Sequence, residues 1–147
     1  MSYTFRREPL RAGNVDPLAN ACESFEEKLV VWTLLDTGVR VSEYCNLRPE
    51  NVEWQFERIV VYGKGGPFGS KSKRRVVPMT PRVRKLLEVR FVTHRGIGMT
   101  QRTVKWVAAR AGIVQHTTPL VIRHTLEQRT LTAQLDWYTG IGFRHGV

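Results

Sequence analysis

Arg40 has the sequence surroundings of an arginine that binds a phosphate. It follows Gly38, which is expected to end one helix, and it stands at the start of a second, short helix. Because both helix ends fix the backbone here, the planar guanidinium can donate two hydrogen bonds to one phosphodiester. An exposed, solvated arginine is the ordinary alternative for a lone residue of this type. Glu43 lies on the same helix face, and we assign it a supporting role.

Basic residues also gather in the glycine-rich segment 63–73. Lys64 lies between two glycines at the expected tip of a β-hairpin, from which a lysine can swing toward a nucleic-acid backbone. Lys71, Lys73 and Arg74 are expected to contact phosphates of the same partner. A nucleotide-binding loop is the alternative, but the segment lacks Gly-Lys-Ser/Thr at the required spacing and connects two strands. ATP binding is therefore disfavoured.

The composition indicates one basic domain that binds a polyanion. The 147 residues, 41% of them apolar, are enough for a single core. Lysine and arginine number 23 against 13 acidic residues, which gives a net charge of +10 and a pI near 10.3. This charge attracts phosphate polyanions, so nucleic acid is the leading partner, although basic proteins of ribosomal type share the property.

Cysteine content and hydropathy favour a cytoplasmic protein without a metal or other cofactor. Cys22 and Cys45 have no neighbouring cysteine or histidine at metal-ligand spacing, and two cysteines do not make a disulfide framework. No apolar run approaches the ~20 residues that cross a bilayer. Residues 1–7 also lack the apolar core of a signal peptide.

The sequence pattern predicts an α+β fold, mostly helical, with a small three-stranded antiparallel sheet. Residues 1–23 mix basic residues with glycine and proline and predict an arm, so that 24–147 form the domain itself. Ser24 is expected to cap a helix that ends at Gly38. A short helix is expected at 39–47, strands at 51–55, 58–62 and 74–78, and further helices from Pro81 to before Gly96, from Thr100 to Ala111, and from Pro119 to about Leu131.

Residues 37–48 and 59–78 resemble two motifs of the tyrosine recombinases, also called phage-type integrases. Thr-Gly-Val-Arg-Val-Ser-Glu, followed by Asn-Leu-Arg, is similar to the family's first arginine box, and Arg40 takes the place of the catalytic arginine. Ile-Val-Val-Tyr-Gly-Lys-Gly-Gly, with Arg-Val-Val-Pro after the loop, is similar to the hairpin that carries the catalytic lysine, whose place Lys64 takes.

Residues 118–126 resemble the family's second arginine box, in which histidine, two variable residues and arginine follow one another. Arg123 takes the place of the arginine, but Leu120 stands where the family has the histidine. A leucine can neither donate a hydrogen bond to a phosphate nor transfer a proton. His116 and His124 lie nearby and are more typical of packing or surface positions.

The resemblance weakens toward residue 147. Phe-Arg-His-Gly stands where the family has a Leu-Gly-His element, so His145 is expected to complete the phosphate-binding set. In the family the nucleophilic tyrosine follows this histidine, whereas two residues follow it here, and Tyr138 precedes it. We therefore expect the chain as it stands to be inactive alone. The segment before Ser24 is also too short to supply the family's amino-terminal helical domain, so the chain is expected to be a truncated relative.

The resemblance implies DNA strand exchange through a 3′-phosphotyrosyl link that needs no metal. Arg40 and Arg123 would bind the non-bridging oxygens, Lys64 would protonate the leaving 5′ hydroxyl, and His145 would hydrogen-bond the phosphate. The partners would be double-stranded DNA and, on it, further copies of the chain or full-length integrase. Two alternatives stay open: a non-catalytic DNA-binding protein derived from a recombinase, and a basic RNA-binding module.

Overall fold

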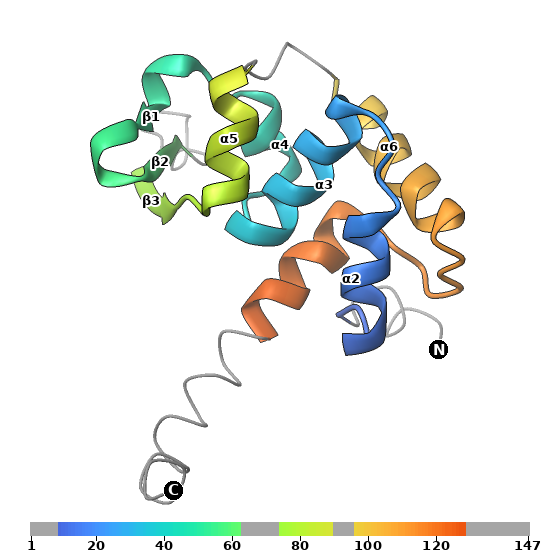
Figure 1. Cartoon of the computed structure of the whole chain (residues 1–147). Helices are drawn as coiled ribbons and strands as arrows, with labels where there is room; N and C mark the ends of the chain where they lie inside the picture. The colour runs from blue at the N-terminus through green and yellow to red at the C-terminus, as the bar shows by residue number, and fades with distance from the viewer. Residues whose placement is uncertain (1–8, 63–73, 90–95, 129–147) are drawn as a thin grey trace, which may run out of the picture.

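The computed structural model of the chain describes residues 9–62, 74–89 and 96–128 (Figure 1). Helices dominate these ranges, and three strands form one antiparallel sheet in the order β1-β2-β3, which confirms the expected α+β fold. Residues 119–128 form a helical segment after the last labelled helix. The labelled elements are α2 (Ala12–Asn20), α3 (Phe25–Thr37), α4 (Val41–Cys45), β1 (Val52–Glu53), β2 (Arg58–Tyr62), β3 (Arg74–Pro78), α5 (Pro81–Val89) and α6 (Ile97–Arg110).

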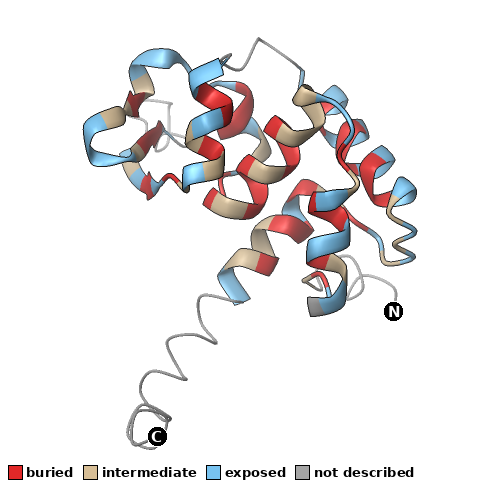
Figure 2. Ribbon diagram, in the orientation of Figure 1, coloured by how far each residue is buried: buried red, intermediate tan, exposed pale blue. Residues whose placement is uncertain are grey.

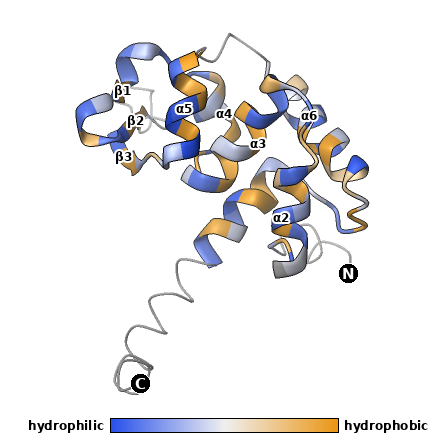
Figure 3. Ribbon diagram, viewed as in Figure 1, coloured by the Kyte–Doolittle hydropathy of each residue, from blue (hydrophilic) through white to orange (hydrophobic). Residues whose placement is uncertain are grey.

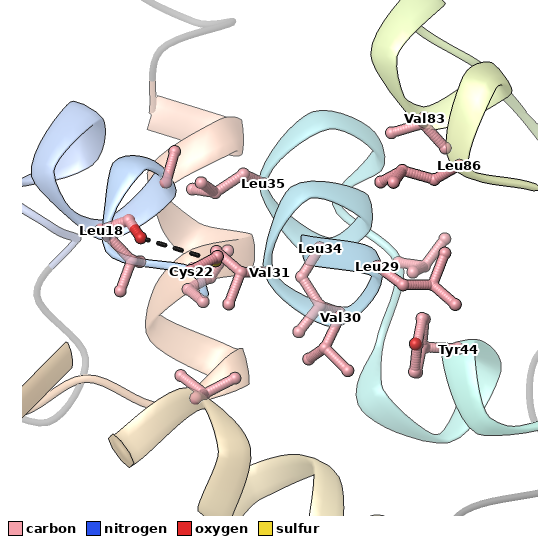
Figure 4. Packing of buried hydrophobic residues seen from close by; sticks show 14 of the residues in the cluster. Leu18, Cys22, Leu29, Val30, Val31, Leu34, Leu35, Tyr44, Val83 and Leu86 are labelled. Atoms are coloured by element: carbon pink, nitrogen blue, oxygen red, sulfur yellow. Dashed lines mark hydrogen bonds between the residues drawn. The ribbon is translucent and has the colours of Figure 1, made fainter. Parts of the chain in front are cut away.

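Helix α3 lies at the centre of the molecule, and α2, α4, α5 and α6 pack around it (Figure 1). A helix that is apolar nearly all round has to be covered on every side. In Figure 4, Leu18 of α2 and Cys22, which follows that helix, lie on one side of α3, and Tyr44 of α4 lies with Val83 and Leu86 of α5 on the other. The buried residues of α3 itself are Leu29, Val30, Val31, Thr33, Leu34, Leu35 and Thr37.

Both expected ends of α3 are confirmed. The Ser24 hydroxyl accepts a hydrogen bond from the Glu27 N–H at 3.1 Å, which caps the first turn. Gly38 ends the helix in the left-handed conformation, with φ 69°, and donates its N–H to the Leu34 carbonyl at 3.1 Å. The chain then turns directly into α4, whose N-cap residue is Arg40.

Helix α5 is the clearest amphipathic element of the fold. Its buried residues Val83, Leu86 and Leu87 recur at helical spacing, and the helix packs against α3. Buried positions on this helix in Figure 2 are hydrophobic in Figure 3, and its exposed positions are mostly hydrophilic. The helix begins at Pro81, as the sequence predicts.

The expected arm at residues 1–23 is corrected between residues 9 and 22, where the chain forms helix α2 and joins the core. The Leu10 N–H donates to the Thr125 hydroxyl at 2.8 Å, which fixes this segment to helical residues 119–128. Pro17 lies inside the helix, and because proline is rare within helices, the sequence pattern did not predict a helix here. The apolar periodicity of this segment is carried by buried Val15, Leu18, Ala19 and Cys22.

Two elements, strand β1 and helix α6, have other bounds than the sequence pattern predicts. Strand β1 is shorter than the predicted 51–55, because 3-10 turns at Pro49–Asn51 and Trp54–Phe56 flank it. Helix α6 starts at Ile97 and not at Thr100. In the parts of the chain that the structure describes, every helix is too short or too polar to cross a membrane.

Candidate phosphate-binding site

The carboxylate of Glu43 joins three segments that lie far apart in the sequence. Its Oε1 accepts a hydrogen bond from the Arg40 N–H at 2.7 Å, which closes the first turn of α4. The same oxygen accepts from Nη2 of Arg75, on strand β3, at 2.6 Å. Nη1 of Arg123, from helical residues 119–128, lies 4.0 Å from it. One buried oxygen therefore organises the start of α4, the sheet and the second arginine box.

Gly38 allows helical residues 119–128 to approach the end of α3. A Cβ atom added at this position would lie 2.6 Å from Cδ2 of Leu126, far inside van der Waals contact. The Gly38 carbonyl accepts a hydrogen bond from Arg123 Nη1 at 2.9 Å. Glycine is favoured here by the positive φ, and the missing Cβ leaves room for the end of the Leu126 side chain.

Arg123 is held from several directions but is not enclosed. Its side chain is 17% exposed, and its Nε lies 3.3 Å from Oε2 of Glu127, one turn further along the helix. The other oxygen of Glu127 lies 3.2 Å from Nδ1 of His124. A guanidinium has five N–H donors, so the contacts with Gly38 and Glu127 leave donors available to a ligand.

Arg40 differs from Arg123 in that only its backbone is held. The residue is exposed, and its guanidinium makes no ion pair within the described ranges. The Glu43 hydrogen bond to its N–H and the preceding Gly38 fix the point from which its side chain projects. Among the residues that the structure describes, the Arg40 guanidinium is therefore without an ion-pair partner, whereas the better buried Arg123 is paired with Glu127.

The cluster keeps a positive charge at neutral pH. Burial alone would raise the pKa of Glu43, but hydrogen bonds from Arg75 and from the Arg40 N–H hold the pKa below its ordinary value. Glu43 is therefore ionised. The positive charge of Arg40 acts on Glu43 without an ion pair, and together with the guanidinium groups of Arg75 and Arg123 it outnumbers the carboxylates of Glu43 and Glu127, so the site suits an anion with several oxygen acceptors.

The remaining residues singled out in the sequence are placed as follows. Leu120 is 51% exposed on the helix that carries Arg123, three residues before it. Arg74 is exposed on β3, opposite Tyr62 of β2. His116 is exposed ahead of the helix. Lys64, Lys71, Lys73 and His145 lie outside the described residues.

Sequence reasoning missed Arg75 as a partner of Glu43 and Glu127 as a partner of Arg123. Strand alternation carries a signal for Arg75, because it shares a face of β3 with buried Val77 and so points toward the core. Glu127 is four residues after Arg123, a spacing at which oppositely charged side chains meet on a helix. Among the described residues, no group of three or more His, Cys, Asp or Glu could hold a metal ion.

Residues 8–139 match the profile of the Phage integrase family. The chain belongs to this family. The resemblance to the tyrosine recombinases predicted from the sequence is therefore confirmed.

The similarity of this integrase-family chain to individual proteins supports the same assignment. It is 27% identical to tyrosine recombinase XerC of Bacillus pumilus (strain SAFR-032) over 121 residues, which cover 70% of the chain and 40% of XerC. The crystal structure of XerA recombinase superimposes with a TM-score of 0.72 at 27% identity, covering 84% of the chain and 49% of XerA. The Tn1549 transposon integrase in complex with transposon right end DNA shares the fold, with a TM-score of 0.62 at 19% identity over 86% of the chain and 54% of that protein. The chain spans less than half the length of XerC and of XerA.

Proposed function

We propose that this domain binds double-stranded DNA and that Arg40 and Arg123 bind one phosphodiester, the one at which a tyrosine recombinase exchanges strands. The observation that carries the proposal is the convergence of both arginine boxes on the Glu43 oxygen. Membership of the integrase family and the DNA-bound Tn1549 integrase support the choice of DNA as the partner.

The chemistry follows from how the two arginines are held. When a nucleophile attacks a phosphodiester, negative charge grows on the non-bridging oxygens of the five-coordinate transition state. Donors that are already in place stabilise that charge without having to reorganise. Arg123, fixed by the Gly38 carbonyl and Glu127, is such a donor, and Arg40 projects from a fixed backbone beside it.

Two further roles rest on motif position alone. We assign Lys64 to the leaving 5′ hydroxyl as general acid and His145 to a hydrogen bond with the phosphate, because each occupies the family's motif position. Lys71, Lys73 and Arg74 are assigned to phosphates along the duplex, where they would add affinity without reading sequence.

Leu120 favours a second candidate function, a recombinase-derived protein that binds DNA without cleaving it. This side chain is half-exposed one turn before Arg123, so an imidazole there would reach a phosphate that Arg123 binds. Leucine leaves that contact unmade and supplies no proton. The RNA-binding alternative gives no reason for Arg40 and Arg123 to converge.

DNA affinity measured against salt concentration tests the proposed function. A fluorescein-labelled duplex of mixed sequence is titrated with wild-type protein, Arg40→Ala and Arg123→Ala. Each substitution is expected to weaken binding and to reduce the slope of log K against log salt by about one. Arg58→Ala, on β2 and paired with Glu53, is the control and should keep the wild-type slope. Unchanged slopes for both Arg40→Ala and Arg123→Ala would overturn the proposal.

A covalent-trapping experiment separates the two candidate functions. The chain is incubated with nicked suicide duplexes of randomised sequence and examined for a DNA adduct that survives denaturant. The non-cleaving candidate predicts DNA binding without an adduct. An adduct formed by this chain alone would reject it in favour of the enzyme.

A further inference from the structure

Arg75 and Arg123 compete for one carboxylate oxygen, and Arg75 holds it. Nη2 of Arg75 makes a hydrogen bond of 2.6 Å to Glu43 Oε1, whereas Nη1 of Arg123 remains 4.0 Å away. The Glu43 side chain is 2% exposed and that of Arg75 is 37% exposed. The buried charge of Glu43 is therefore balanced mainly by an arginine from the sheet and not by the arginine of the second box.

A buried carboxylate needs a close cation, because desolvation of an unpaired charge is expensive. If Arg75 were removed, the nearest cationic side chain among the described residues would be Arg123, which already lies at the outer limit of an ion pair with Glu43. A small rotation of its guanidinium would close that gap. The donors that would bind a phosphate would then be directed toward Glu43.

The second oxygen of Glu43 makes this rearrangement favourable. Oε2 is buried and has no hydrogen-bond partner among the described residues. Without Arg75, Oε1 would keep only its hydrogen bond from the Arg40 N–H and Oε2 would remain open, so the carboxylate could accept two parallel hydrogen bonds from a guanidinium. Such a two-point pair with Arg123 would replace the single hydrogen bond that now joins Arg75 to Glu43.

The position of Arg75 is fixed by its strand. Arg75 pairs with Val61 in the β2–β3 ladder, and Val77 on the same strand face is buried in the core. Directly after the strand, the Met79 N–H donates to the Glu57 carbonyl at 2.9 Å. The guanidinium therefore extends to Glu43 from a rigid support.

We propose that Arg75 is a positioning residue: it occupies the Glu43 carboxylate and so keeps the guanidinium of Arg123 free for the phosphate. The inference rests on the proposed function, since it concerns the availability of Arg123 to DNA. It gives Arg75 a role in DNA binding that requires no contact between Arg75 and DNA.

The test is Arg75→Gln, measured as DNA affinity and salt slope on the labelled mixed-sequence duplex. We expect affinity about tenfold lower and a slope smaller by about one, as if Arg123 itself had been lost. Arg75→Gln combined with Arg123→Gln should be no weaker than Arg123→Gln alone. In a Glu43→Gln background, where no carboxylate captures Arg123, Arg75→Gln should change affinity less than twofold. Arg75→Lys keeps a cation beside Glu43 and should restore most of the affinity.

Several outcomes would contradict the inference. If Arg75 contacts DNA directly, its loss will add to that of Arg123→Gln and will persist in the Glu43→Gln background. If Arg75→Gln binds as wild type does while Arg123→Ala loses affinity, the inference fails and the proposed function stands. If Arg123→Ala also binds DNA as the wild type does, the proposed function fails, and the inference about Arg75 fails with it. Arg58→Gln is the matched control for the loss of one positive charge, and circular dichroism checks that each variant is folded. If Glu43→Gln unfolds, the comparison of Arg123→Gln with the Arg75→Gln/Arg123→Gln double variant tests the inference by itself.

Discussion

Two helices of this domain, α3 and α4, have a glutamate three residues after the N-cap, and the two glutamates make different contacts. In α3, Glu27 sits three residues after the N-cap, accepts the Glu23 N–H at 2.8 Å, and pairs with Arg110 of α6 through both oxygens, at 2.6 and 3.1 Å. In α4, Glu43 sits three residues after the N-cap and accepts the Arg40 N–H. It then meets two arginines with one oxygen and leaves the other unpaired among the described residues.

We interpret the difference as that between a structural ion pair and the proposed phosphate-binding site. At Glu27, Arg110 makes a bidentate pair, its Nε lies 3.5 Å from Glu23 Oε2, and its Nη1 also donates to the Ala21 carbonyl, so its charge is balanced and few donors remain. At Glu43 the cations outnumber the carboxylates, and their surplus donors can serve a ligand. The surplus of donors at Glu43 is the property on which the proposed binding of a phosphate rests.

Gly38→Ala should have the largest effect, because it pushes the two arginine boxes apart. The new methyl group would meet Leu126 at 2.6 Å on a backbone with φ +69°, so we expect a loss of about 2–4 kcal/mol in the free energy of unfolding. Urea denaturation of the wild type and the variant measures this free energy of unfolding. Gly112→Ala is the matched control, since φ is +75° there with open space around the added Cβ, and strain alone costs about 1 kcal/mol. Equal losses at both positions would show that the Leu126 contact is unimportant.

Glu27→Gln should lower stability in a pH-dependent way. The hydrogen bond from Arg110 is the main cause that lowers the pKa of Glu27 from 4.5 to about 2. A carboxyl group with a lowered pKa stabilises the fold above its ordinary value, and this stability is lost as the pH falls from about 4.5 toward 2. The wild type should therefore exceed Glu27→Gln in thermal stability at pH 7, and the gap should narrow at pH 3. A gap independent of pH would contradict the assigned pair.

Glu127→Gln should have a smaller effect than these variants, and it should raise DNA affinity, whereas loss of Arg123 lowers it. Glu127 is 53% exposed and holds Nε of Arg123 at 3.3 Å, so its charge competes with a phosphate for this arginine. We expect DNA affinity to rise about two- to threefold at low salt and less at high salt, because an exposed pair is weak and screened. Glu88→Gln, which breaks an exposed pair on α5, is the control. Equal gains in both variants would indicate a general charge effect.

The fold was largely predictable from the sequence because local signals agreed with tertiary packing. Gly38 stops a helix and Pro81 starts one, each by backbone chemistry that tolerates few alternatives. Helix α2 was missed because Pro17 obscured a short apolar pattern whose stability comes from packing against α3. Such a helix is specified by its neighbours more than by its own propensity.

The candidate site was predictable only in part. Arg40 and Arg123 follow from the motifs, but a motif names residues and not their contacts. The shared use of Glu43 by Arg75 and Arg123 depends on side-chain distances across a sheet and two helices, which no sequence spacing encodes. Lys64 and His145 remain predictions from motif position.

The most direct test of the difference between the two clusters removes one arginine from each. Arg123→Gln and Arg110→Gln change the net charge equally, and both arginines pair with a glutamate in the structure. DNA affinity measured against salt should lose about one unit of slope for Arg123→Gln and keep the wild-type slope for Arg110→Gln. Equal slopes for the two variants would contradict the account, because the arginines at Glu43 would then contribute no more to DNA binding than the structural pair at Glu27.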